Sequence, residues 1–268
     1  MEDLPTGLAS SNASKIAKRL GLISGGKVLD VATARGRFID TLMKTLKAYD
    51  SFVGIDYCAS DESREDMESA KKRFEGKPVE FLEMDAEYLK FEDTSFDTVC
   101  TGYSLHHFGN IDRVLAEMKR VLKPDGYFLV QEEFSAGEQS EAQRTDILRH
   151  HWDSEIDSLL GIVHHKTFPK QKIKDIMSSL QLTKLHTYES TYPIRCLICG
   201  RKFDCCEGKG EVTIDQFAKE IDDNLRRLDE QVDLQVLERL RKEGEKLKER
   251  MREYGVANAS NLFFIGRK

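Results

Sequence analysis

The stretch Lys27-Val-Leu-Asp-Val-Ala-Thr-Ala-Arg-Gly-Arg-Phe38 decides the fold. Its first five residues predict a buried strand, and the small residues that follow predict a tight turn that opens a helix near Gly36. Residues with little or no side chain let a ligand approach the backbone closely. The unpaired N–H groups of a helix's first turn suit a carboxylate or phosphate at the same place. The stretch therefore indicates a ligand site, although a close strand–helix junction would use the same residues.

Acidic residues follow the next two predicted strands. Asp56 and Asp85 stand at the ends of two short apolar runs. Strand and helix signals alternate from Lys27 to Phe134, which predicts a mostly parallel sheet with helices on both faces. Ligands of such sheets bind beyond the carboxyl ends of the strands. We therefore expect Asp30, Asp56, Asp85 and Tyr103 to share one crevice.

Five motifs resemble, in order, those of class I S-adenosylmethionine-dependent methyltransferases, most closely the small-molecule branch that includes ubiquinone and menaquinone biosynthesis methyltransferases. They are Asp30-Val-Ala-Thr-Ala-Arg-Gly36, Gly54-Ile-Asp-Tyr57, Met84-Asp-Ala86, Ser95-Phe-Asp-Thr-Val99 and Leu122-Lys-Pro-Asp-Gly126. The resemblance covers residues 27–134 and the last strand. It implies an α/β, Rossmann-like, doubly wound seven-stranded sheet with an antiparallel last strand and helical cap insertions.

The resemblance also implies S-adenosyl-L-methionine as cofactor and S-adenosyl-L-homocysteine as product. Asp56 would accept two hydrogen bonds from the ribose diol. Asp85 and the Ala86 N–H would contact adenine, and Asp30 would hold the loop and reach the cofactor amine through water. The plain alternatives are a surface acid for Asp56 and a helix cap for Asp85. The expected cofactor-binding residues are Asp30, Ala32, Thr33, Ala34, Arg35, Gly36, Asp56, Tyr57, Asp85, Ala86 and Tyr103.

The turn departs from the resembled family. The family usually carries glycine where Ala32 and Ala34 stand, and a bulky cation is unexpected at Arg35. Arg35 could form a salt bridge with the cofactor carboxylate. We favour the alternative, in which its side chain points outward and only its backbone contributes. Tyr57 along the adenosine and Tyr103 near the methionine could equally be core residues.

Histidines follow the fourth predicted strand, where the resembled family holds its methyl acceptor. His106 or His107 could take a proton from a hydroxyl acceptor, so both are candidate catalytic residues, with a structural role as the favoured alternative. The pairs His150-His151 and His164-His165 could line an acceptor pocket. Adjacent helical residues point about 100° apart, so each pair would turn one ring inward at most.

Four thiols lie within eleven positions: Cys196, Cys199, Cys205 and Cys206. A Cys-x-x-Cys pair suits zinc or an iron–sulfur cluster. The vicinal pair is awkward as two ligands of one small site. We therefore predict no metal here, and free thiols or a redox pair instead.

The rest of the chain predicts a helical cap on a single methyltransferase domain. Helices are expected at about residues 12–20, 138–160 and 169–180, and two more between residues 213 and 254. The first of those two carries an apolar stripe of Ile214, Phe217, Ile221, Leu225, Leu228 and Val232. The cap would exclude water from the acceptor. The predicted core comprises about residues 27–134, 181–192 and 259–268, and the cap about residues 1–25, 138–180 and 193–256.

Composition excludes several classes of protein. The formal charge of −6 and the absence of a basic stripe of interleaved aromatics speak against nucleic-acid binding. No apolar run approaches the roughly 20 residues of a membrane span, and the N-terminus lacks the pattern of a signal peptide. Six cysteines in 268 residues do not make a disulfide scaffold. We expect a cytoplasmic protein, with a homodimer through the C-terminal helices left open.

Three functions compete at this stage. The leading one is methyl transfer to an unidentified small-molecule acceptor, because a sulfonium methyl is an intrinsic electrophile and needs mainly alignment. The second is a non-catalytic S-adenosylmethionine-binding sensor or interaction protein of the same fold. The third is a nicotinamide dinucleotide enzyme, against which the missing Gly-x-Gly-x-x-Gly pattern counts.

Overall fold

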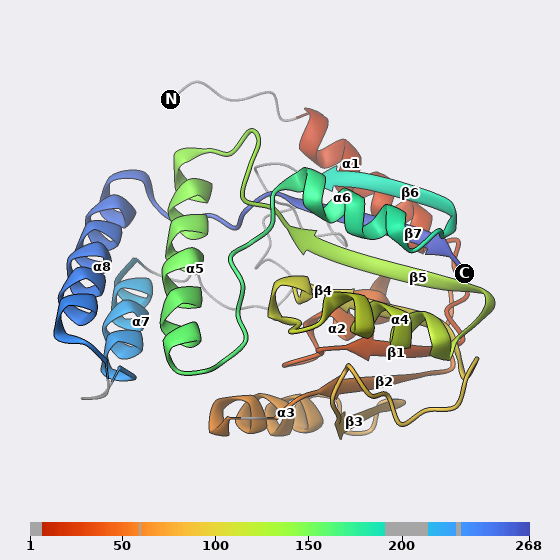
Figure 1. Cartoon of the computed structure of the whole chain (residues 1–268). Helices are drawn as coiled ribbons and strands as arrows, with labels where there is room; N and C mark the ends of the chain where they lie inside the picture. The colour runs from red at the N-terminus through yellow and green to blue at the C-terminus, as the bar shows by residue number, and fades with distance from the viewer. Residues whose placement is uncertain (1–6, 59, 191–213, 229–231) are drawn as a thin grey trace.

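The computed structural model describes residues 7–58, 60–190, 214–228 and 232–268. Its centre is a seven-stranded sheet in the order β3-β2-β1-β4-β5-β7-β6 (Figure 1). Strands β1 to β5 run parallel, and β7 pairs antiparallel with both β5 and β6. The predicted fold class is confirmed. The strands are β1 (Lys27–Val31), β2 (Ser51–Asp56), β3 (Val79–Glu83), β4 (Phe96–Gly102), β5 (Leu122–Glu133), β6 (Thr183–Ser190) and β7 (Asn261–Arg267).

Helices cover both faces of the sheet, and each face has its own apolar core. On one face, Leu20, Leu42 and Phe74 pack against strand residues such as Phe52. On the other face, Met118 and Met177 pack against the opposite sides of the strands. The helices of the first face are α1 (Gly7–Leu20), α2 (Arg37–Thr45) and α3 (Asp61–Arg73), and those of the second are α4 (Ile111–Val121) and α6 (Lys170–Ser179).

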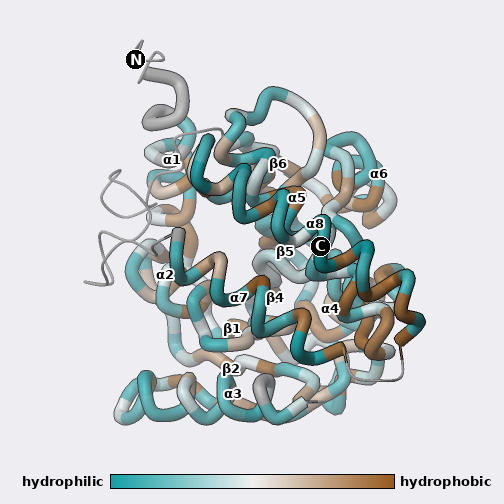
Figure 2. Tube along the Cα trace, turned by 90° about the vertical axis from the view of Figure 1, so that its left-hand side faces the viewer, coloured by the Kyte–Doolittle hydropathy of each residue, from teal (hydrophilic) through white to brown (hydrophobic). Residues whose placement is uncertain are grey.

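Local sequence signals set several helix boundaries. Ser60 caps α3 by accepting from the Ser63 N–H at 3.1 Å, and Asn110 caps α4 by accepting from the Arg113 N–H at 3.0 Å. Figure 2 shows α3 almost entirely in the hydrophilic colour, as its charged sequence requires. Serine and asparagine are preferred at helix N-caps, so the sequence alone predicts caps at Ser60 and Asn110, and the structure agrees.

Two local predictions are wrong. Helix α1 begins at Gly7 rather than near Asn12. The turn motif Lys123-Pro-Asp-Gly126 predicts a positive φ at Gly126 and a strand from Tyr127. Strand β5 instead begins at Leu122, and Asp125 has the positive φ, of 58°. Glycine is required at 126 for a different reason, because a Cβ there would lie 2.4 Å from the Leu122 side chain. Space, not backbone conformation, selects that glycine.

Helix α1 packs on the edge of the sheet. Ile16 and Leu20 are buried in the same apolar core as α2. The side-chain amide of Asn12 donates to the carbonyl of Glu189 in the edge strand β6, at 2.6 Å. The leading helix therefore covers the edge of the sheet.

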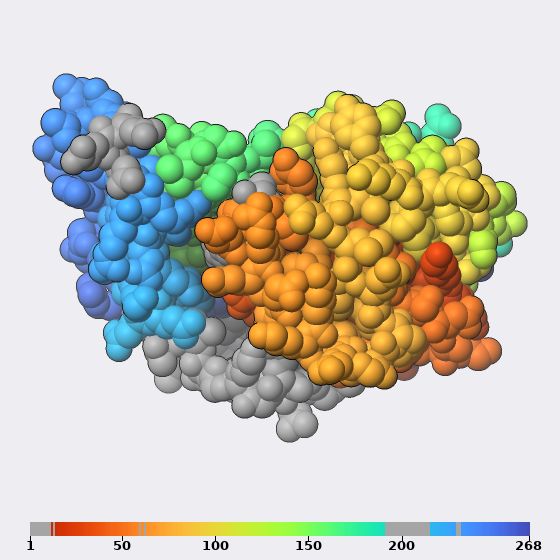
Figure 3. Space-filling model, turned by 90° about the horizontal axis from the view of Figure 1, so that it is seen from below, coloured from red at the N-terminus to blue at the C-terminus, as the bar shows by residue number. Residues whose placement is uncertain are grey.

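A third apolar core lies beside the sheet, between α5 (Glu141–Leu159), α7 (Ile214–Arg226) and α8 (Leu234–Tyr254). Seen from below, the blue surface of α7 and α8 lies at one side of the molecule, next to the green of α5 (Figure 3). The stripe predicted for α7 lies in this core through Phe217, Ile221, Leu225, Leu228 and Val232. Thr213, which the capping-box pattern Thr213-Ile-Asp-Gln216 predicts as the cap of α7, lies outside the described residues. The buried members are Trp152, Ile156, Ile221, Leu228, Leu240, Leu247 and Met251.

Among the helices in the described ranges, none is both long enough and apolar enough to cross a membrane.

Candidate active site

The turn after β1, residues 32–36, is called the elbow below. Three of its residues have positive φ: Ala32 at 58°, Ala34 at 43° and Gly36 at 70°. Glycine adopts this conformation freely, whereas each alanine costs about 1 kcal/mol. A Cβ on Gly36 would also lie 2.8 Å from the Phe74 ring, so this position is closed to larger residues. The backbone of the elbow is therefore strained, as is common in segments that bind ligands.

Thr33 ties the elbow to the sheet beneath it. Its hydroxyl donates to Asp30 Oδ2 at 2.7 Å, and its N–H donates to the Ile55 carbonyl at 2.9 Å. Gly54 makes room for this contact, because a Cβ there would lie 2.9 Å from the Thr33 side chain. Asp30 is 1% exposed, and burial raises the pKa of its carboxyl to about 7. Asp30 thus acts on the elbow through Thr33.

The buried Asp30 carboxyl makes a pH-dependent contribution to stability. Its raised pKa means that the folded chain holds this proton above the pH at which an unfolded aspartate releases it. Stability is therefore lost as pH rises from about 4 to about 7, on the order of 4 kcal/mol for this group. Asp30→Asn has no charge to bury and can still accept from Thr33. We expect its thermal unfolding midpoint, relative to that of the wild type, to rise across this pH window.

Thermal unfolding of the cofactor-free protein between pH 4 and pH 8 measures this effect. The exposed Asp50 provides a matched control, since Asp50→Asn should follow the wild-type profile. Parallel profiles for Asp30→Asn and the wild type would contradict the prediction.

The acidic ends of the first strands lie side by side. Asp30 pairs in register with Gly54, and Asp56 with Glu83, so the carboxyl ends of β1, β2 and β3 share one edge. The strand order reverses between β1 and β4, which is where ligands bind in open α/β sheets. The Ala34 N–H donates to Asp56 Oδ2 at 2.6 Å. The half-buried Asp56 carboxylate is thus attached directly to the elbow.

The remaining predicted nucleoside contacts lie at the surface. The Tyr57 side chain is 65% exposed, and Asp85 is exposed as well. Asp85 Oδ1 accepts from the Glu87 N–H at 2.8 Å, which is the turn-capping geometry. Ala86 is partly buried against the core of the second sheet face.

Arg35 points away from the elbow. Its Nε donates to Asp66 Oδ1 of α3 at 2.6 Å, and its side chain is half exposed. The residue contributes its backbone to the elbow and its charge to the surface.

Tyr103 is fixed against β5. It has a φ of 58°, its N–H donates to the Gln131 carbonyl at 2.7 Å, and its hydroxyl accepts from the Gln131 side chain at 2.7 Å. The Ser104 hydroxyl contacts the Ala32 carbonyl at 3.3 Å. This contact joins the loop after β4 to the elbow.

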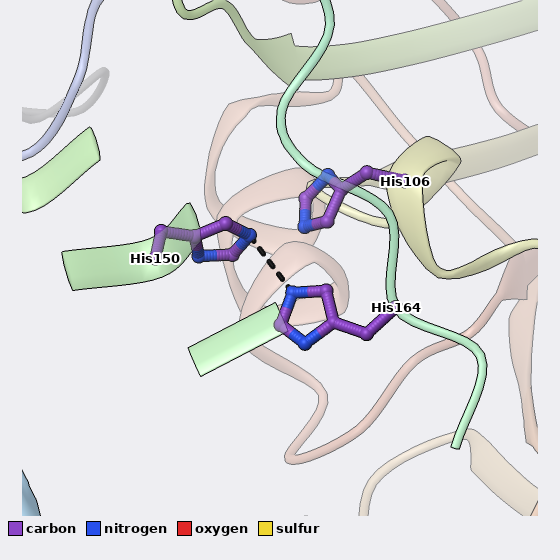
Figure 4. Close-up of side chains that lie close together, drawn as sticks. All are labelled: His106, His150 and His164. Atoms are coloured by element: carbon purple, nitrogen blue, oxygen red, sulfur yellow. Dashed lines mark hydrogen bonds between the residues drawn. The ribbon is translucent and has the colours of Figure 1, made fainter. Parts of the chain in front are cut away.

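Histidines from three segments meet beside the end of β4. His106 and His107 belong to the short helix η1 (Leu105–His107), His150 to α5, and His164 to the loop before α6. The imidazole rings of His106, His150 and His164, called the histidine centre below, converge on one another (Figure 4). The Nε2 atoms of His150 and His164 are 2.9 Å apart. His107 stacks on His164 with ring centroids 4.2 Å apart but is the more exposed ring.

The neighbours in the histidine pairs turn elsewhere. His151 Nε2 contacts the Thr167 hydroxyl at 2.7 Å, and His165 lies near the Phe168 ring. One ring of each pair therefore faces the centre. The sequence suggested this for each pair separately, but it gave no sign that the pairs would meet at His106.

Carboxylates surround the histidine centre. His106 Nδ1 lies 2.6 Å from Glu132 Oε1, and the other Glu132 oxygen accepts from the Leu105 N–H at 2.8 Å. His164 Nδ1 lies 2.6 Å from Asp157 Oδ2. Burial lowers the pKa of His106 to about 3 and raises the pKa of Glu132 to about 8. His106 is therefore a neutral imidazole at physiological pH.

The structure describes two of the six cysteines. Cys58 and Cys100 are free and buried, and Cys100 Sγ lies 3.4 Å from Asp30 Oδ1. Cys196, Cys199, Cys205 and Cys206 lie outside the described residues, so their pairing stays a prediction.

The part of the chain that matches known proteins contains the elbow and the acidic strand ends. Residues 29–130 match the family model described as a methyltransferase domain. Over this segment the chain resembles a methyltransferase domain. This segment contains the elbow, Asp56, Asp85 and the two histidines of η1.

Curated relatives of this segment are named as methyltransferases. The chain is 38% identical over 111 residues to the ubiquinone/menaquinone biosynthesis C-methyltransferase UbiE of Desulfotalea psychrophila, covering 41% of this chain and 43% of that protein. It is 36% identical over 107 residues to a phthiotriol/phenolphthiotriol dimycocerosates methyltransferase of Mycobacterium ulcerans, covering 40% and 37%. The chain thus spans less than half the length of these curated relatives.

Solved structures share the fold over nearly the whole chain. A Bacillus halodurans protein proposed to be a methyltransferase covers 96% of this chain and 99% of its own, with a TM-score of 0.56 and 17% identity. The [4+2]-cyclase SpnF has the same TM-score and identity and covers 97% of this chain and 80% of its own. At this identity the likeness concerns the fold alone, and SpnF is named for a reaction other than methyl transfer.

Proposed function

We propose that this chain transfers a methyl group from S-adenosyl-L-methionine to a small-molecule acceptor. The observation that carries the proposal is the hydrogen bond between the elbow and Asp56, which joins two ligand-binding elements of a methyltransferase domain at one edge of the sheet. The named activities of the relatives support the same reaction.

Each part of the crevice has a role in this proposal. The Asp56 carboxylate accepts from the ribose diol, while Asp85 and the Ala86 N–H contact the adenine. The elbow faces the amino-acid end of the cofactor, where the N–H groups of the first turn of α2 suit a carboxylate. Asp30 supports the elbow through Thr33. The protein aligns the acceptor with the sulfur–methyl bond, and this proximity supplies most of the catalysis.

The acceptor in this proposal is apolar. Four large apolar side chains of residues 159–163 are exposed directly before His164. Exposed apolar runs of this kind mark ligand or partner sites in soluble proteins. Val163 also lies close to Gly109, which follows η1. The exposed side chains are Leu159, Leu160, Ile162 and Val163.

The test of the proposed function has two parts. Isothermal titration calorimetry with S-adenosyl-L-methionine and S-adenosyl-L-homocysteine measures cofactor binding, for which we expect one site per chain. Incubation with labelled S-adenosyl-L-methionine and a panel of reduced quinones, phenols and amines measures transfer. Binding without transfer to any acceptor would favour a sensor, and no binding would overturn the proposal.

Substitution in the apolar run separates acceptor binding from cofactor binding. We expect Ile162→Ser combined with Val163→Ser to raise the KM of an apolar acceptor about 30-fold, because two buried contacts of about 1 kcal/mol each would be lost. The Kd of S-adenosyl-L-homocysteine should stay unchanged. Leu22→Ser is the control, since Leu22 is exposed and precedes β1. It therefore lies at the amino ends of the parallel strands, away from the carboxyl ends where the ligands are expected. An unchanged KM in the double variant would show that the acceptor binds elsewhere.

A further inference from the structure

The histidine centre has the dimensions of a metal site. The ligand nitrogens of His106, His150 and His164 lie within 4.8 Å of one another. In the part of the chain that the structure describes, this is the one group of three or more potential ligand side chains gathered so closely. A zinc ion with bonds of about 2.0 Å to nitrogen holds its tetrahedral ligands about 3.3 Å apart. The 2.9 Å between the His150 and His164 nitrogens and the 4.8 Å limit lie on either side of that value, so small ring rotations suffice.

The rings are oriented as metal ligands are. The Nδ1 atoms of His106 and His164 each meet a carboxylate at 2.6 Å, from Glu132 and Asp157. His150 Nδ1 lies 3.8 Å from Glu133. Metal-bound histidines are held in this way, with one ring nitrogen on the metal and the other donating to a carboxylate, which fixes the tautomer. The arrangement leaves the Nε2 atoms for the centre, and Figure 4 shows the rings turned toward one another.

Carboxyl groups surround the histidine centre. Three of them contact the three rings from outside. The neighbouring guanidinium groups are already engaged by acids. Arg149 pairs with Asp146 at 3.0 Å and Asp153 at 2.7 Å, while Arg227 pairs with Asp157 at 2.6 Å. A cation bound between the mostly buried imidazoles would stabilise the ionised form of these carboxyl groups.

We propose that His106, His150 and His164 bind a divalent transition-metal ion through their Nε2 atoms. Imidazole ligands suit zinc, copper, iron and nickel, and a compact set of three histidines fits tetrahedral zinc best. Three protein ligands leave one position open, as in catalytic rather than structural zinc sites. That position takes water or an oxygen, nitrogen or sulfur atom of a small molecule. The alternative is a stack of neutral imidazoles that serves packing alone. This proposal does not depend on methyl transfer.

The experiment measures metal binding by the full chain. Cys196, Cys199, Cys205 and Cys206 are first replaced by serine, so that thiolates cannot account for bound zinc. Zinc is titrated into this parent protein in competition with a chromophoric chelator, and bound metal is counted by mass spectrometry. We expect one zinc per chain. Cobalt should give the visible bands of a tetrahedral site without thiolate charge-transfer bands.

Matched variants assign the site. His150→Ala should weaken zinc binding at least 100-fold, and Glu132→Gln, which leaves all three ligands in place, 10- to 100-fold. His165→Ala is the control, since its ring lies outside the centre, and it should bind zinc like the parent. Circular dichroism establishes that each variant is folded, and Glu132→Gln decides the matter if His150→Ala is not. Failure of the parent to bind one zinc, or equal affinity in the folded variants, would overturn the proposal in favour of the packing alternative.

Discussion

Asp56→Ala is expected to weaken binding of S-adenosyl-L-homocysteine at least 100-fold. The substitution removes a carboxylate that accepts from the Ala34 N–H at 2.6 Å and, in the proposed complex, from the ribose diol. Charge-assisted hydrogen bonds contribute about 1.5 to 3 kcal/mol each, and 100-fold in affinity corresponds to about 2.7 kcal/mol. Loss of the diol contacts alone therefore accounts for the expected change. Disorder of the elbow would add to it.

Isothermal titration calorimetry measures this change. Asp56→Asn keeps an acceptor for the Ala34 N–H and should bind more tightly than Asp56→Ala. Asp66→Ala is the control, because it removes only the surface partner of Arg35 and should leave the Kd within about threefold of the wild-type value. An Asp56→Ala protein that binds like the wild type would contradict the placement of the cofactor at the elbow.

Trp152→Ala is expected to destabilise the part of the helical cap that α5, α7 and α8 form. The expected loss is about 4 kcal/mol, the usual cost of removing a large buried aromatic side chain. Trp152 is 5% exposed and lies in the core between α5, α7 and α8. Its indole N–H donates to the Leu240 carbonyl at 3.1 Å, so the substitution also removes that partner. Because this core is separate from the two cores of the sheet, the loss should concentrate in the cap.

Hydrogen exchange followed by mass spectrometry resolves the two regions. In Trp152→Ala, exchange should accelerate in α7 and α8 while β1 and β4 keep their protection. Leu148→Ala is a control in the same helix, since Leu148 is 46% exposed. Equal acceleration in the cap and the sheet would mean that the three cores unfold as one unit.

Much of the fold could be predicted from local signals. The end of β1, the cap residues Ser60 and Asn110 and the apolar stripe of α7 each depend on residues close in sequence. The turn at Lys123–Gly126 was harder. There a steric contact with Leu122 selects glycine at position 126. The turn motif alone does not distinguish a glycine required for space from one required for a positive φ.

The candidate site also has one part that the sequence could predict and one part that it could not. Asp30 and Asp56 could be predicted because parallel strands bring their carboxyl ends to one edge. The histidine centre could not, because His106, His150 and His164 come from segments that no repeat or spacing connects. Glu132-Glu133 at the end of β5, beside the end of β4, was the available sign. Two adjacent acids there need buried partners, and histidines are among the residues able to provide them.

The two alanines of the elbow carry a consequence for engineering and for comparison among homologues. Changing Ala32 and Ala34 to glycine would release a steric penalty that the chain now bears in its resting form. It would also loosen the unfolded chain and the loop itself. Substitution at these two positions therefore changes the rigidity of the elbow and the thermal stability of the chain together. It leaves the side chains of Asp30, Thr33 and Asp56 in place.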